Sequence, residues 1–328
     1  MSSVGYWAAV FAMTLAAVAA AVGAFVRVVK AQQESPQATF QVPSSLDGEL
    51  QPCLFVPAKS QEPRPLVVAL HPWSHGFDTY ASMVLWERTA EARDWHYLQP
   101  HFRGPNRRPD ACASAKARQD ILDAVDYVLK HYKVDERRVY LVGGSGGGHM
   151  ALVMAAHAPK RWAAVSAWCP IADLRAWHDE TKAAGRTYWS DIEAACGGAP
   201  GSSEEVDRQF EYRSPVFHLA NAKGVPLDIN TGIHDGHTGS VPIHHAIDAF
   251  DAIARARGDS TVSDADIARL SSEQPLDVPA EQDETYGRHI YLRRYSGPSR
   301  ITIFEGGHEG EALAETAFCW LEKQSRDR

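Results

Sequence analysis

A single serine lies within a run of glycines, where residues 143–147 read Gly-Gly-Ser-Gly-Gly. This run fits the pattern GxSxG, in which the positions two before and two after the serine must be small so that a strand and a helix can pack against a sharp turn. The turn presents the hydroxyl group, so Ser145 is the predicted nucleophile. Phosphate binding is excluded by the pattern: no lysine follows as in a P-loop, and His149 replaces the third glycine of GxGxxG.

A serine hydroxyl needs a general base, and the base needs an acid that orients it. Asp235 follows the predicted strand VPLDINTG and His308 follows the predicted strand RITIFEGG. The order serine, acid, histidine is the one that this kind of strand–turn–helix arrangement uses. Ser145, Asp235 and His308 are therefore the predicted catalytic triad. Asp228 inside a strand and His289 in an irregular segment are the weaker alternatives.

Two backbone N–H groups are needed to stabilise the oxyanion of a tetrahedral intermediate. One comes from the residue after the nucleophile, Gly146. The other is expected in the loop His71-Pro72-Trp73-Ser74, where Pro72 has no N–H, so Trp73 is the predicted donor. Six further residues are candidates for substrate binding, with packing or an ion pair as the structural alternative: His71, His101, Arg103, Asp173, Trp177 and Arg213.

Apolar strand patterns alternate with helix patterns along the chain. The runs PLVVAL, VYLVGG, WAAVSAW and RITIF lack polar alternation, which is typical of parallel strands covered on both faces. The sequence thus predicts an α/β fold with a mostly parallel, doubly wound sheet, and in such sheets functional residues follow the carboxyl ends of strands. Residues 170–225 interrupt the alternation as a predicted cap. Residues 258–296 are expected to form an irregular surface excursion.

These motifs together resemble the α/β-hydrolase superfamily, and within it the catalytic domain of the prolyl oligopeptidase family and related esterases. The resemblance rests on VYLVGGSGGGHMAL, on RSP at 213–215, on GIHDGHTGSVP at 232–242 and on EGGHEG at 305–310. It implies ester or peptide hydrolysis through an acyl-enzyme. Only residues 32–65 separate the apolar start from the first core strand, so the β-propeller of the large oligopeptidases is not expected. That departure favours an esterase, and a peptidase of prolyl oligopeptidase type without a propeller is the alternative.

Two other functions remain open at this point. A metal hydrolase is one, because His234, His237, His244 and His245 crowd the segment around Asp235. Zinc accepts such ligands, but no HExxH helix is present, so we expect neither a metal nor a cofactor. A catalytically inactive binding module is the other.

The overall charge bears on partners. The chain has 328 residues and a formal net charge of -8. Nucleic acid is excluded as a main partner because phosphate binding requires a basic face. The expected partner is a small-molecule or oligomeric ester or amide substrate.

The N-terminal segment is apolar, with no charged residue before Arg27. It is expected to be a transmembrane anchor, with membrane attachment through residues 4–26, or a signal peptide within residues 1–31. The catalytic domain would then cover residues 32–328, exported or membrane-anchored in an open orientation. Export would permit a Cys169–Cys196 disulfide, and isolated thiols are the alternative.

Overall fold

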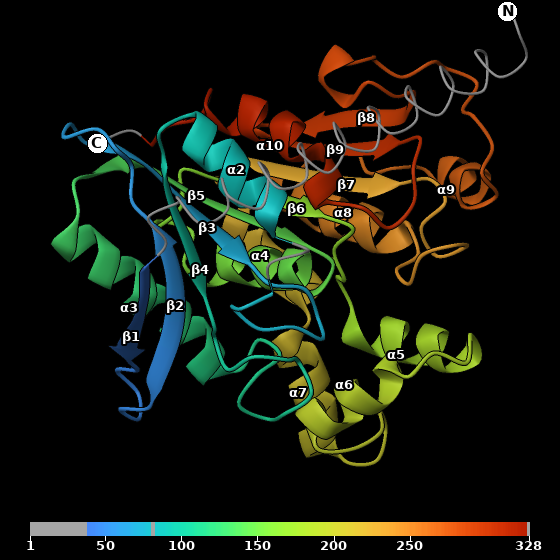
Figure 1. Ribbon diagram of the computed structural model, residues 1–328. Coiled ribbons are helices and arrows are strands. Elements are labelled where there is room, and N and C mark those ends of the chain that lie inside the picture. The colour runs from blue at the N-terminus through green and yellow to red at the C-terminus, as the bar shows by residue number, and fades with distance from the viewer. Residues whose placement is uncertain (1–37, 80–82, 327–328) are drawn as a thin grey trace, which may run out of the picture. The chain divides into compact units, whose positions relative to one another are not determined.

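The computed structural model describes residues 38–79 and 83–326, which contain one nine-stranded sheet in the order β1-β2-β4-β3-β5-β6-β7-β9-β8 (Figure 1). The segment predicted as an anchor or signal peptide lies outside these residues. Within the part of the chain that the structure describes, no helix combines the length and apolar character needed to cross a membrane. The strands are β1 (Ala38–Pro43), β2 (Leu50–Val56), β3 (Arg64–Leu70), β4 (His96–Pro100), β5 (Val134–Gly144), β6 (Ala164–Trp168), β7 (Leu227–Gly232), β8 (Ile290–Ser296) and β9 (Ser299–Phe304).

The centre of the sheet is parallel, from β4 through β3, β5, β6 and β7 to β9, while β1, β2 and β8 pair antiparallel at the two edges. Every residue of β4, β6, β7 and β9 is buried. Parallel strands acquire this uniform burial because their connecting helices cover both faces. The predicted mostly parallel α/β sheet is confirmed.

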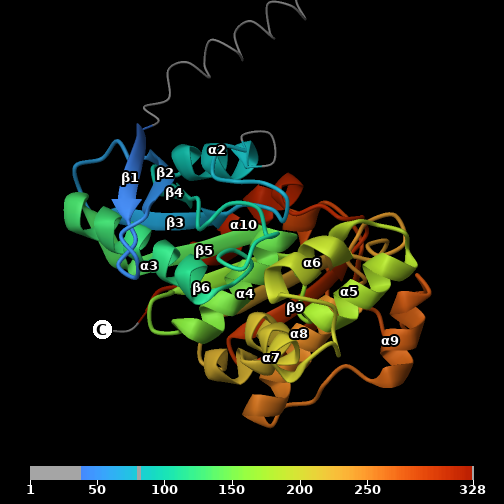
Figure 2. The same ribbon diagram turned by 90° about the horizontal axis from the view of Figure 1, so that it is seen from below.

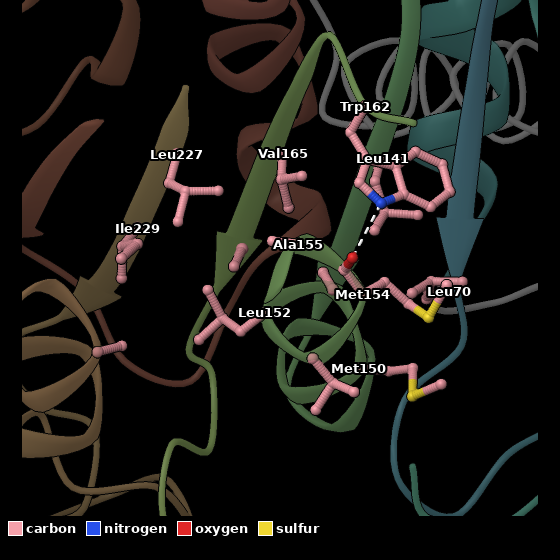
Figure 3. Close-up of a cluster of buried hydrophobic side chains, with 14 of the residues drawn as sticks. Leu70, Leu141, Met150, Leu152, Met154, Ala155, Trp162, Val165, Leu227 and Ile229 are labelled. Atoms are coloured by element: carbon pink, nitrogen blue, oxygen red, sulfur yellow. Dashed lines mark hydrogen bonds between the residues drawn. The ribbon is translucent and has the colours of Figure 1, made fainter. Parts of the chain in front are cut away.

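Helices cover the two faces of the sheet in separate groups. One face carries α3 (Ala115–His131), α4 (Gly146–His157) and α8 (His244–Arg257), and the other carries α2 (Val84–Ala92) and α10 (Ala314–Leu321). Residues 146–156 of α4 are all buried, as expected for a helix that is apolar on every side. Figure 3 shows Met150, Leu152 and Met154 of this helix among core side chains, with the Trp162 indole donating to the Met154 carbonyl at 3.0 Å.

Residues 170–225 form the segment predicted as a cap. It contains α5 (Leu174–Ala183), α6 (Tyr188–Cys196), α7 (Glu204–Arg213) and the 3-10 helices η1 (Pro215–Phe217) and η2 (Leu219–Ala222). Figure 2 shows α5, α6 and α7 grouped together. They share a small apolar core with the loop after β3, to which Trp73, Trp177 and Phe210 contribute.

Residues 258–296 are more regular than predicted. They contain α9 (Asp264–Ser271), η3 (Glu284–Tyr286) and the edge strand β8, which pairs with β9. The sequence pattern did not predict this strand, because it contains two consecutive arginines. The Arg293 side chain is 1% exposed and pairs with Asp283 at 3.3 Å, so a charge occupies an inward position that strand patterns normally give to an apolar residue. The short helix η4 (Glu311–Leu313) precedes α10.

Candidate active site

Ser145 lies on a sharp turn between the end of β5 and the start of α4. Its φ of 58° and ψ of -122° are sterically unfavourable for a residue with a side chain. The turn is held by two hydrogen bonds: the Ser145 N–H donates to the Trp168 carbonyl at 2.8 Å, and the His149 N–H donates to the Ser145 carbonyl at 2.9 Å. This is the geometry that the GxSxG pattern predicts.

The glycines around Ser145 are required by close backbone approach. A Cβ atom at Gly143 would overlap the backbone of Gly147, and one at Gly147 would overlap the Leu70 carbonyl of β3. These positions are two before and two after the serine. The small residues of the pattern therefore let α4 begin directly against β5 and β3.

Asp235 and His308 meet at the carboxyl ends of β7 and β9. The His308 Nδ1 atom lies 2.7 Å from Asp235 Oδ2. A carboxylate can only accept, so Nδ1 carries the proton and Nε2 is the unprotonated nitrogen of the neutral ring. The other oxygen, Asp235 Oδ1, accepts from the N–H groups of Gly236 at 3.0 Å and Val241 at 3.1 Å. The Asp235 side chain is fully buried, whereas that of His308 is 24% exposed.

Gly239 closes the loop over this pair. A Cβ atom there would overlap Asp235 Oδ1 and would lie 2.5 Å from the His308 Cβ. The backbone of the loop thus packs directly against the Asp235 carboxylate and the His308 side chain.

A cavity of about 250 Å³ opens beside Ser145 and His308. Its walls come from the loop after β3, the end of β5, the residue after β6, the start of α6 and the loop after β9. The lining residues are Pro72, Trp73, Ser74, His75, Gly144, Ser145, Cys169, Tyr188, His308, Glu309 and Gly310.

Several of these lining residues were not predicted as site residues. Cys169 directly follows β6, so the rule that functional residues follow strand ends would have found it. Its thiol contacts the Glu309 carbonyl at 3.7 Å, and burial raises the thiol pKa well above its usual value, so the group is neutral. Glu309 is adjacent to His308 in sequence, and its carboxylate pairs with Arg288 at 2.6 Å. No local sequence signal marks Tyr188.

Gly146 and Trp73 bring two backbone amides to the same place. A Cβ atom on Gly146 would overlap the backbone nitrogen of Trp73. Gly146 is the first residue of α4, so its N–H has no acceptor within the helix. The backbone hydrogen bonds assigned among the described residues include none donated by Trp73 or Gly146. Both amides are thus available to an oxygen placed near Ser145.

None of the six candidates for substrate binding lines this cavity. His71 is buried against Phe102, with ring centroids 3.9 Å apart, and burial lowers its pKa to about 4. His101 lies beside Phe77. Asp173 is the N-cap of α5 and accepts from the Arg175 N–H at 2.8 Å. Trp177 is buried under Trp73 and donates to the Ser240 carbonyl at 2.8 Å.

The two arginines among these candidates have structural partners instead of a free guanidinium. Arg103 is 1% exposed and pairs with Asp120, Asp47 and Glu49. Arg213 donates Nη1 to the carbonyls of residues 111 and 112 and Nη2 to that of residue 109, at 2.8 to 2.9 Å. The donors of both side chains are thus engaged within the protein, and neither side chain lines the cavity beside Ser145.

The histidines of the metal-hydrolase alternative separate into different environments. His234 bonds Glu273 and Glu305, both at 2.7 Å, and His237 bonds the Ser271 carbonyl at 3.0 Å. His244 and His245 instead converge on Glu180 of α5. This trio is poorly suited to a metal. His245 Nδ1 accepts from the N–H of residue 172 at 3.3 Å, so the ring proton is on the Nε2 atom that faces Glu180.

His244 is bonded by carboxylates at both ring nitrogens, Asp248 at Nδ1 and Glu180 at Nε2. Burial opposes a charge there, but these hydrogen bonds outweigh it and raise the His244 pKa to about 9. Burial opposes a charge on Glu180 too, but its hydrogen bonds to His244 and His245 outweigh burial and lower the Glu180 pKa to about 2. The cluster is thus an ion pair between α5 and α8.

The cysteines remain unpaired in the structure: Cys53, Cys112, Cys169, Cys196 and Cys319 are all free. Cys169 contacts the His308 loop, and Cys196 lies in the apolar core of α5, α6 and α7. The structure therefore has isolated thiols rather than the Cys169–Cys196 disulfide.

Comparisons with known proteins identify the family of the chain. Residues 88–265 match the model of the prolyl oligopeptidase family. The chain is similar to "Acylamino-acid-releasing enzyme 2" of Oryza sativa subsp. japonica, with 27% identity over 65% of this chain and 28% of that protein. It is also similar to "Feruloyl esterase B" of Talaromyces funiculosus, with 29% identity over 37% of this chain and 36% of that protein. The chain thus spans about a third of the length of these curated relatives.

A solved structure shows the same fold. The Pyrococcus horikoshii acylaminoacyl peptidase superposes with a TM-score of 0.62 and 14% identity, over 92% of this chain and 44% of that one. The match to the family model spans more than half of this chain and includes the turn of Ser145. The chain therefore belongs to the prolyl oligopeptidase family and has its α/β-hydrolase fold.

Proposed function

We propose that this protein hydrolyses carboxylic esters through an acyl-enzyme on Ser145. The proposal is carried by one observation: the His308 ring is fixed by Asp235 at 2.7 Å and lines the same cavity as Ser145. The nucleophile and its base thus face a common space, with the base in the tautomer that can accept a proton. Family membership supports hydrolytic chemistry at this site.

In the proposed mechanism His308 Nε2 takes the proton of the Ser145 hydroxyl as Oγ attacks the ester carbonyl. Asp235 holds the ring and stabilises the imidazolium that forms. The N–H groups of Gly146 and Trp73 donate to the oxyanion of the tetrahedral intermediate. His308 then returns the proton to the leaving alcohol, and water releases the acid by the same route.

Cavity size and charge favour an ester with a small neutral acyl group. A volume of about 250 Å³ is small for a ligand site. Among the described residues that line the cavity, Glu309 is the one carboxylate, and it is already paired with Arg288. These described lining residues thus offer no unpaired carboxylate, lysine or arginine to recognise a charged peptide terminus.

A peptidase that removes acylated amino acids is the second candidate. It is favoured by the similarity to "Acylamino-acid-releasing enzyme 2", which extends over 65% of this chain. The two candidates share the chemistry of Ser145 and differ in the leaving group.

The test has two stages. Wild type and Ser145→Ala are first treated with a fluorophosphonate probe, and we expect labelling of the wild type only. The kcat/KM of p-nitrophenyl acetate is then compared with those of N-acetyl-alanine p-nitroanilide and a prolyl p-nitroanilide. A higher value for the ester supports the first candidate, and a higher value for acetyl-alanine anilide replaces it with the second. A folded wild type that is not labelled would reject both.

A further inference from the structure

A second cavity lies at the far end of α4 from Ser145. It has a volume of about 210 Å³ and is lined by residues of α3, α4, the end of α7 and the segment around η2. Its lining residues are Arg118, Val153, Ala156, His157, Tyr212, His218 and Asn221. The two cavities have no lining residue in common.

Arg118 is the central polar group of this cavity. Its side chain is buried, at 5% exposure, and is held on two sides. Nε donates to the Ala113 carbonyl at 2.9 Å and Nη2 donates to the Tyr212 carbonyl at 2.6 Å, while the Tyr212 ring lies 4.1 Å from Cζ. Among the residues that the structure describes, no acceptor is assigned to Nη1.

The charge of Arg118 is not neutralised by the protein. Its contacts are carbonyl groups and a ring, and no carboxylate of the described residues forms an ion pair with it. The neighbouring cation Arg213 likewise bonds carbonyls and the Gln209 amide. A buried guanidinium without a carboxylate partner is unusual, because desolvation of the charge is costly unless a counter-charge compensates it.

Two histidines lie close enough to Arg118 to be affected by its charge. Burial, together with the charge of Arg118, lowers the pKa of His157 at the cavity wall. Burial, with the charges of Arg118 and Arg213, also lowers the pKa of His149 to about 4, against the effect of its hydrogen bond to the Arg213 carbonyl. The charge at the cavity wall is thus positive, carried by Arg118, although the net charge of the chain is -8.

We propose that this cavity is a binding site for a small aliphatic carboxylate, separate from the catalytic cavity. The free Nη1 hydrogens and the second Nη2 hydrogen form an edge that matches the two oxygens of a planar carboxylate. His218 and Asn221 provide additional polar contacts at the wall, and Val153 and Ala156 provide an apolar surface for a short chain. The apolar wall favours an aliphatic carboxylate over phosphate, because phosphate has no apolar part to pack against Val153 and Ala156.

The experiment is an NMR titration of the histidine ring signals of full-length Ser145→Ala protein with butyrate and, separately, with inorganic phosphate. Ser145→Ala removes the nucleophile, so the result is independent of the proposed ester hydrolysis. Butyrate should shift the His157 signal saturably. By neutralising the charge of Arg118 it should also raise the His157 pKa.

Two variants keep the test decisive. Arg118→Gln should weaken butyrate binding at least roughly tenfold, and Ala156→Leu should do the same by filling the cavity while Arg118 and its hydrogen bonds remain. Arg161→Gln is the matched control, because Arg161 is a nearby cation whose partner is the surface residue Asp126, and it should bind as the parent protein does.

Three results would overturn the proposal. The His157 signal would fail to move with butyrate, or both cavity variants would bind butyrate with the parent affinity, or phosphate would bind at this site more tightly than butyrate does. The last result would make the site a phosphate site.

Discussion

Gly146 and Trp73 are in direct backbone contact, so that a methyl group on Gly146 would overlap the Trp73 nitrogen. This contact joins the start of α4 to the loop after β3 and keeps the two proposed oxyanion donors together. Gly146→Ala should push the amides apart and lower kcat for p-nitrophenyl acetate by about 100-fold or more. The control is Gly224→Ala, because nothing lies within 4 Å of the added methyl group there. A Gly146→Ala enzyme with wild-type kcat would reject this oxyanion hole.

Asp235→Asn tests the orientation of His308. The amide N–H can donate a hydrogen bond to Nδ1, which would favour the wrong ring tautomer, so kcat should fall by a factor of about 10³ to 10⁴ while the fold is retained. Stopped assays with p-nitrophenyl acetate and thermal unfolding measure the two effects. Asp248→Asn is matched, since Asp248 also bonds a histidine, His244, but away from the cavity. If the two variants lose kcat equally, the assignment of Asp235 fails.

Asp120→Ala tests the structural role of Arg103. The variant leaves the buried guanidinium without its most buried partner, so the free energy of unfolding should fall by about 3 kcal/mol. Urea unfolding gives that value, and KM for an ester should stay unchanged. Asp126→Ala on the same helix removes only a surface pair with Arg161 and should change stability by less than about 0.5 kcal/mol. A raised KM in Asp120→Ala at normal stability would restore the substrate role of Arg103.

The His244 ion pair should make stability depend on pH on the alkaline side. The folded-state pKa of about 9 lies above the unfolded value of 6.5, so the stabilisation is complete below pH 6.5 and is lost as the pH rises through 9. Because the His244 side chain is partly exposed, solvent screening limits its contribution to the free energy of unfolding to about 2 kcal/mol.

Urea unfolding between pH 6 and pH 10 measures this loss. The wild type should lose the extra stability over that range and His244→Asn should not. His131→Asn is the control, because that exposed ring donates a hydrogen bond to the Tyr127 carbonyl and forms no ion pair with a described residue. Parallel pH curves for wild type and His244→Asn would contradict the assignment.

The sequence predicted the sheet and the proposed triad because those features depend on local pattern. Ser145, Asp235 and His308 each lie in the loop or turn that follows a strand, and the parallel order of β5, β7 and β9 brings such positions to one edge. The steric need for Gly143 and Gly147 is also local, since both flank a single turn. The order of the strand ends along the chain was therefore sufficient to predict the three residues of the proposed triad.

Long-range pairing could not be predicted in the same way. Arg103 and Arg213 look like substrate ligands in the sequence, because nothing nearby shows that Asp120 or the carbonyls of residues 109–112 will reach them. Glu180 lies 64 residues before His244, so the sequence did not show that they form an ion pair. In the structure His244 bonds Glu180 instead of joining the other histidines near Asp235. In β8 the Arg293 side chain is buried, whereas a charged residue in a strand pattern normally indicates an exposed position.

The hydrogen bonds of Arg213 to three main-chain carbonyls fasten the end of α7 to the loop at residues 109–112. The start of α6 is held more lightly: the Trp73 indole donates to Asp191 Oδ2 at 3.2 Å, and the Tyr188 ring stacks on Trp177 at 5.0 Å between centroids. Tolerance to change should thus be uneven across the cap. Substitutions near Tyr188 can alter which acyl groups are accepted at little cost to folding, whereas substitutions at Arg213 would cost stability first. Evolution or laboratory selection for new substrates should therefore concentrate its successful changes in α6.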